Sequence, residues 1–94
     1  MSLGGSNPYT EKNLDKMTFE REFSVAENSD EFVWHRDRED RLVEIISGVG
    51  WRFQRDNCLP VHLNPGDKFA IEKNEWHRII KGDTNLVIKV IKCL

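Results

Sequence analysis

The chain has 94 residues, which is enough for one compact domain and too short for two hydrophobic cores. Fourteen basic and sixteen acidic side chains leave a net charge of -2, so the overall charge does not favour nucleic acid or an anionic membrane as a partner. Hydrophobic residues make up 38% of the chain, as in folded globular proteins, and no apolar run approaches the ~20 residues of a membrane span. We therefore expect a single-domain protein with no nucleic-acid partner and no membrane partner.

The two cysteines, Cys58 and Cys93, lack metal-type spacing and are too few for a disulfide framework. We expect two free thiols in a reducing compartment, which predicts a cytoplasmic protein. Residues 1–6 resemble a cloning remnant, and residues 7–16 are polar without a clear period. We therefore expect residues 1–16 to form a tag-like and flexible N-terminal arm, and residues 17–94 to form the folded domain.

The remainder of the chain consists of short apolar alternations separated by clusters of Gly, Pro, Asn and Asp, which are typical of turns. Seven or eight short strands with turns every eight to twelve residues, and no helical stripe, predict an all-β sandwich or barrel. In chain order, the expected strands cover residues 17–25, 31–37, 41–47, 51–54, 59–63, 69–71, 76–80 and 86–91.

Three residues give the main lead to function. His35 and Asp37 alternate along the strand expected over residues 31–37, so both side chains should lie on one face. His77 stands at the start of a later strand, where the chain turns back over the core and a histidine can point inward. The pattern is thus His-x-Asp with a distant His.

The segment around His35 resembles the first sequence motif of the cupin superfamily, which reads His-x-His, three or four residues, Glu, six residues, Gly. In this chain the same frame is occupied by His35, Asp37, Arg41 and Gly48. The second family histidine is therefore replaced by an aspartate, and the family glutamate by an arginine.

The second family motif reads Gly, five residues, Pro-x-Gly, two residues, His. Here Gly66 is followed by five residues, Glu72-Lys73-Asn74, two residues and His77. The spacing and the histidine are present, while the middle Pro and Gly are lost. Seventeen residues separate Gly48 from Gly66, which suits short members of the family.

The resemblance implies a double-stranded β-helix, that is, a cupin-like jelly-roll barrel, with a metal site inside it. His35, Asp37 and His77 would bind a divalent transition metal (Fe, Mn, Ni or Zn) and are similar to the two-histidine-one-carboxylate triad of non-haem iron oxygenases. Arg41 would point into the same cavity and hold an anionic or polar small-molecule substrate through paired hydrogen bonds. Enzymes of this build include dioxygenases and sugar isomerases or epimerases.

The residues also allow a reading without metal. Buried charges need partners, and Asp37 beside Arg41 would satisfy this rule as an ion pair, with both histidines merely hydrogen-bonded in the barrel. The protein would then be a non-catalytic small-molecule-binding or dimeric structural module. Aromatic residues opposite the histidine face, Phe32 and Trp34, would lie outside the barrel and form a patch that predicts a homodimer.

Overall fold

The computed structural model describes residues 9–93, which form eight strands and one short 3₁₀ helix. The chain is all-β, as predicted. The elements are β1 (Tyr9–Asn13), β2 (Thr18–Phe23), η1 (Asp30–Phe32), β3 (Asp40–Ser47), β4 (Arg52–Arg55), β5 (Val61–His62), β6 (Lys68–Ile71), β7 (His77–Ile80) and β8 (Leu86–Cys93).

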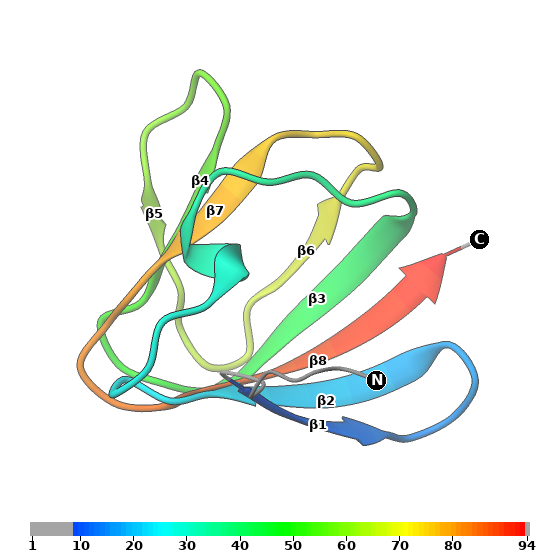
Figure 1. Ribbon diagram of the computed structural model, residues 1–94, viewed down its shortest axis with the longest axis horizontal. Coiled ribbons are helices and arrows are strands. Elements are labelled where there is room, and N and C mark those ends of the chain that lie inside the picture. The colour runs from blue at the N-terminus through cyan, green and yellow to red at the C-terminus, as the bar shows by residue number, and fades with distance from the viewer. Residues whose placement is uncertain (1–8, 94) are drawn as a thin grey trace.

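The strands form two antiparallel sheets that face each other, as in a jelly-roll barrel (Figure 1). One sheet has five strands in the order β1-β2-β8-β3-β6, and the other has three strands in the order β5-β4-β7. Strand β3 contacts β8 along its full length, and their register shifts between Ile45 and Ser47. Such a bulge bends a strand and helps a sheet to curl around its core.

The core lies between the two sheets and is made by side chains that alternate inward along each strand. Burial alternates with period two in β8, for example, where Leu86, Ile88 and Val90 face inward. Trp51, just before β4, is fully buried, and its indole Nε1 donates a 2.6 Å hydrogen bond to the carbonyl of Thr84. The buried apolar residues are Phe19, Phe23, Val43, Ile45, Trp51, Phe53, Leu63, Ile71, Ile79, Leu86, Ile88 and Val90.

The structure differs from the sequence prediction most clearly at residues 31–37, where we expected one strand. Ser29 instead caps a 3₁₀ turn, because its hydroxyl accepts a 3.1 Å hydrogen bond from the Glu31 amide. Strand-like pairing is limited to one bridge, which joins His35 to His77. The predicted alternation therefore holds for His35 and Asp37 and not for the whole segment.

The same turn separates the two aromatic residues that were expected to form one outer patch. The Phe32 ring packs against the core, with its centroid 5.6 Å from that of Trp51 and 5.8 Å from that of Phe23. Trp34 lies on the outside, where the guanidinium of Arg78 stacks over its ring at 5.0 Å. The patch thus loses Phe32, and the homodimer stays a prediction.

The N-terminal arm expected over residues 1–16 lies partly outside the described residues, because the description begins at residue 9. Residues Tyr9–Asn13 form β1, which pairs antiparallel with β2 at the edge of the larger sheet. The division of the chain at residue 17 stays a prediction. Cys58 and Cys93 are free thiols at exposed positions, and no helix within residues 9–93 has the length and apolar character to cross a membrane.

Candidate metal centre

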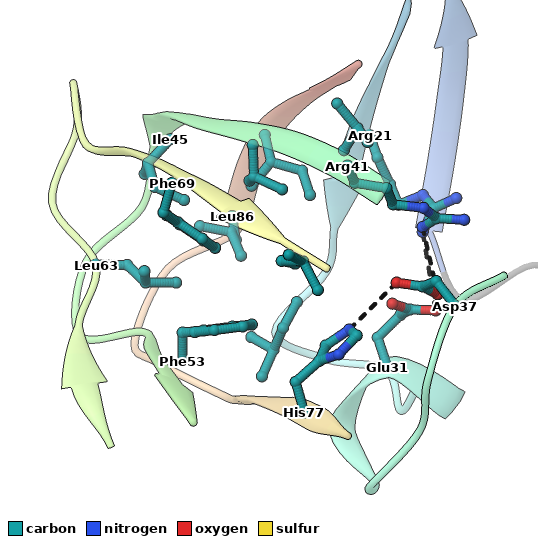
Figure 2. A pocket seen from close by; sticks show the side chains of 15 residues that line it. Arg21, Glu31, Asp37, Arg41, Ile45, Phe53, Leu63, Phe69, His77 and Leu86 are labelled. Carbon is teal, nitrogen blue, oxygen red and sulfur yellow. Dashed lines mark ion pairs between the residues drawn. The ribbon is translucent and has the colours of Figure 1, made fainter. Parts of the chain in front are cut away.

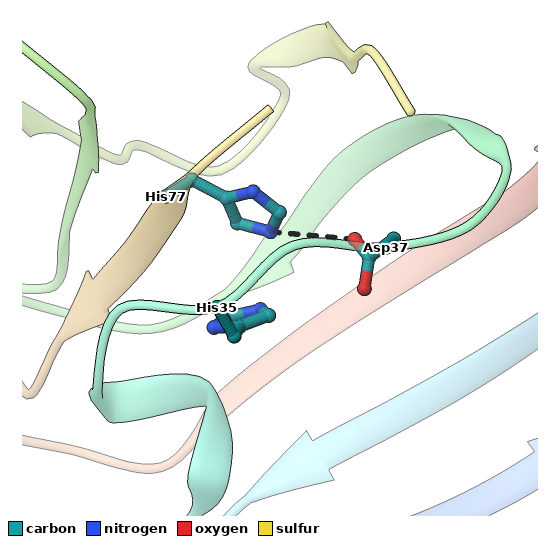
Figure 3. A group of neighbouring side chains, drawn as sticks. All are labelled: His35, Asp37 and His77. Carbon is teal, nitrogen blue, oxygen red and sulfur yellow. Dashed lines mark ion pairs between the residues drawn. The ribbon is translucent and has the colours of Figure 1, made fainter. Parts of the chain in front are cut away.

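Backbone pairing brings His35 and His77 together. The His35 amide donates to the His77 carbonyl at 3.0 Å, and the His77 amide donates to the His35 carbonyl at 2.9 Å. Directly paired residues of antiparallel strands project their side chains to the same face. The two imidazole rings accordingly lie edge to face, with centroids 4.3 Å apart (Figure 3).

Each imidazole is held in one orientation by a carbonyl of its own segment. His35 Nδ1 lies 2.9 Å from the Val33 carbonyl, and His77 Nδ1 lies 2.8 Å from the Glu75 carbonyl. A carbonyl can only accept, so Nδ1 carries the proton in both rings, and Nε2 of a neutral ring keeps its lone pair. Metal-binding histidines are commonly held in this way.

Asp37 lies two residues beyond His35, and its carboxylate reaches the same place (Figure 3). Its position is fixed by the loop between β6 and β7, because the Asn74 amide donates a 2.7 Å hydrogen bond to the Asp37 carbonyl. Asp37 Oδ2 lies 3.3 Å from His77 Nε2. One ligand atom from each of His35, Asp37 and His77 lies within 4.8 Å of the others, so the three predicted ligands converge.

Glu31, which belongs to neither of the two sequence motifs, also reaches this cluster. It lies on η1, four residues before His35, and its Oε1 is 3.0 Å from His35 Nε2. The two groups form an ion pair when His35 is protonated, and the buried His35 Nε2 has no other hydrogen-bond partner among the described residues. A neutral imidazole would direct a lone pair toward a carboxylate, which is unfavourable without a proton or a cation between them.

The ionisation of the cluster follows from these contacts. Burial alone would lower the pKa of His35, but the Glu31 carboxylate and the Val33 carbonyl outweigh burial, and the pKa is raised above 6.5. Burial alone would raise the pKa of Asp37, but His77 and Arg41 hold it below 3.8. The pKa of Glu31 is likewise lowered, because contact with His35 outweighs burial. Without metal, the site therefore favours charged carboxylates and a proton on His35.

Arg41, at the start of β3, lines a cavity that Glu31, Asp37 and His77 also line (Figure 2). Its guanidinium lies 2.8 Å from Glu39 Oε2 and 3.6 Å from Asp37 Oδ1. The shorter contact is with Glu39, so Asp37 is not committed to Arg41. The Asp37 contact with His77 is also shorter than its contact with Arg41.

The cavity between the sheets has a volume of ≈ 30 Å³ (Figure 2). Its walls are apolar, and its charged residues gather at one end: Arg21, Glu31, Asp37, Arg41 and His77. A cavity needs about 10–15 Å³ to hold a single water, whereas pockets for drug-sized ligands measure about 300–1,000 Å³. The interior can therefore hold an ion and a water-sized ligand, while a larger metabolite has to remain partly outside or widen the cavity.

The donor set fits a divalent transition metal. Two neutral imidazole nitrogens and one or two carboxylates are ligands typical of Fe, Mn, Ni and Zn. A further observation that favours a cation is that the buried His35 Nε2 faces the Glu31 carboxylate, a contact that needs a proton or a metal ion between the two atoms.

Solved structures with the same architecture were found by structural comparison, although no family model and no curated protein sequence matches the chain. A cupin domain from Bordetella pertussis Tohama I superposes with a TM-score of 0.63 at 15% identity, covering 97% of this chain and 100% of its own. A candidate mannose-6-phosphate isomerase from Ralstonia eutropha JMP134 superposes with a TM-score of 0.65 at 17% identity, covering 90% of this chain and 82% of its own. The DMSP lyase DddQ from Ruegeria pomeroyi DSS-3 superposes with a TM-score of 0.64 at 12% identity, covering 90% of this chain and 46% of its own.

Identities this low show the shared fold alone, so the site rests on the geometry of this chain. The two facing antiparallel sheets, the spacing of the two motifs and the superpositions agree with one another. The chain is a small protein with the cupin fold.

Proposed function

We propose that this protein binds one divalent transition metal through His35, Asp37 and His77. The observation that supports this most directly is the pair of Nδ1 contacts to backbone carbonyls, which places the lone pair of each neutral ring on Nε2, where a metal can bind. The Asp37 carboxylate supplies the third ligand and balances part of the cation's charge. When bound, such a metal would supply Lewis acidity or oxygen activation at its open coordination positions.

We further propose that Arg41 orients a small anionic or polar ligand beside this site. A guanidinium can hold a carboxylate or phosphate through two parallel hydrogen bonds. Arg41 now contacts Glu39 and Asp37, so a ligand would have to take the place of one carboxylate. Two superposing structures, a candidate mannose-6-phosphate isomerase and a DMSP lyase, make a small polar metabolite a reasonable substrate class. A metal-dependent dioxygenase or a sugar isomerase or epimerase would both fit this proposal.

A second candidate function is a non-catalytic module in which the Asp37–Arg41 contact is structural. The 3.6 Å distance between Arg41 Nη1 and Asp37 Oδ1 favours it. In that case the barrel would bind a small molecule, or serve as a dimeric assembly piece, with both histidines held only by their carbonyls. The site would then not depend on metal.

Elemental analysis distinguishes the two candidates. Wild type, His77→Ala and His62→Ala are purified without added metal, His62 being an exposed histidine on β5 that serves as the matched control. The metal proposal predicts about one divalent ion per chain in wild type and in the control, and its loss in His77→Ala. A wild-type protein that contains no metal, takes none up and keeps its melting temperature in chelator would instead support the non-catalytic module.

A further inference from the structure

We propose that Glu31 is a fourth ligand of the metal. Its carboxylate would take the role that the arginine at position 41 cannot fill. This inference rests on the metal-binding function proposed above. Within the first motif, the frame places Arg41 where cupins have a glutamate, and the Arg41 guanidinium is already paired with Glu39. Glu31 comes from the opposite end of the segment, on η1, and reaches the same end of the cavity (Figure 2).

The distances around the two histidines match those between neighbouring ligands of one metal. Ligand atoms about 2.1 Å from a metal, at angles of about 90–110°, lie about 3.0–3.4 Å from each other. His35 Nε2 lies 3.0 Å from Glu31 Oε1, and His77 Nε2 lies 3.3 Å from Asp37 Oδ2. Each imidazole thus has a carboxylate at the spacing of a second ligand. The group whose ligand atoms all lie within 4.8 Å of one another is His35, Asp37 and His77, so the Glu31 carboxylate would move toward Asp37 and His77 when a metal binds.

The charges of the cluster favour a divalent cation. Within residues 9–93, ion pairs link four carboxylates, on Glu11, Glu31, Asp37 and Glu39, to the guanidinium groups of Arg21 and Arg41. With neutral histidines, these six side chains carry two excess negative charges. Partly buried negative charge needs compensation, and one divalent ion between the histidines and the carboxylates would supply it.

The position of Glu31 is set by the local fold. Ser29 caps the 3₁₀ turn that contains Glu31. The turn brings the Glu31 side chain next to the ring of His35, four residues later in the chain. The Glu31 side chain is only 22% exposed, although a glutamate on a surface turn could extend into solvent. Its inward position is what a ligand requires.

Titration with Co²⁺, followed by visible absorption, tests this inference on chelator-treated full chain. The variants are Glu31→Gln, Glu44→Gln and His77→Ala. Glu44 is the control because it is a half-buried glutamate on β3, paired across the sheet with Lys68 and Lys89, and it does not line the cavity. Circular dichroism melts of each metal-free variant show whether it folds, and a folded Glu31→Asp variant replaces Glu31→Gln if the latter does not.

The inference predicts that Glu31→Gln weakens Co²⁺ binding by more than 10-fold and changes the visible spectrum, since a ligand is lost. Glu44→Gln should bind within about twofold of wild type and keep its spectrum. Wild-type affinity, or an unchanged spectrum, in folded Glu31→Gln would overturn Glu31 as a ligand, while loss of binding in His77→Ala would leave the metal proposal standing. Failure of wild type to bind Co²⁺ would overturn both proposals.

Discussion

The metal-free protein should become less stable as the pH rises through neutrality, and bound metal should remove this dependence. The pKa of His35 is raised above 6.5 in the folded state by contact with Glu31. The folded protein therefore binds this proton more tightly than the unfolded chain does. The stabilisation is complete below pH 6.5 and is lost as the pH rises through the folded pKa.

The size of the effect follows from the exposure of the pair. The His35 and Glu31 side chains are 17% and 22% exposed, and partly exposed ion pairs contribute up to about 1 kcal/mol. In a domain of this length, 1 kcal/mol changes the melting temperature by about 4–8 °C. Metal at 100 times its dissociation constant would add about 2.7 kcal/mol, and its binding strengthens with pH because the ligands must be deprotonated.

Thermal melts between pH 6 and 8, with chelator or with excess Zn²⁺, measure both effects. We expect the melting temperature to fall across this range in chelator, by at most about 4–8 °C, and to stay level or rise with Zn²⁺. The exposed His62 provides a control, since His62→Ala should behave as wild type does. A metal-free melting temperature that rises from pH 6 to 8 would refute the raised proton affinity of His35.

The remaining predictions concern stability. The lowered pKa of Asp37 stabilises the fold above pH 3.8, and this contribution disappears as the pH falls through the folded pKa. In Asp37→Asn, the metal-free protein should therefore lose less stability in acid than wild type does. Urea denaturation at pH 3 and 6 measures this difference. Trp51→Phe removes the 2.6 Å hydrogen bond to the Thr84 carbonyl and should lower the free energy of unfolding, measured in urea, by about 1–3 kcal/mol. Gly82→Ala places a Cβ 2.5 Å from the Trp51 amide nitrogen and should cost about 1–3 kcal/mol or more, which a thermal melt would detect. Leu59→Ser, at a position 86% exposed, should change the unfolding free energy in urea by less than about 0.5 kcal/mol.

Sequence reasoning could predict that His35, Asp37 and His77 converge because their placement depends on backbone geometry, while their role as metal ligands stays a proposal. Residues two apart on an extended chain share a face, so His35 and Asp37 point the same way. His77 begins a strand in which buried residues alternate, and Ile79 follows it on the inner face. The same argument fails at Val33, which is 60% exposed, because the chain leaves the 3₁₀ turn just before it.

Two features of the structure, strand β1 and the position of Glu31, could not be predicted from the sequence pattern. Strand β1 lies at a sheet edge, and its residues 10–13 are all exposed, so the segment has no apolar alternation to mark it. Glu31 follows Ser29 by two residues, which is a capping signal for a short turn. We expected a strand there, so the four-residue spacing from Glu31 to His35 was not used. Only the turn makes that spacing meaningful.

The backbone pairing of His35 with His77 has a structural role as well as a chemical one. Residues 33–39 connect η1 to β3, and the described backbone hydrogen bonds of their central part are the two between His35 and His77 and the one from Asn74 to Asp37. A metal held by His35, Asp37 and His77 would connect the same two chain segments a second time. Binding should therefore slow hydrogen exchange at the His35 and His77 amides more than at the amides of β8, which the larger sheet already protects. Equal slowing at all of these amides would show that metal stabilises the whole fold without closing this end of the barrel in particular.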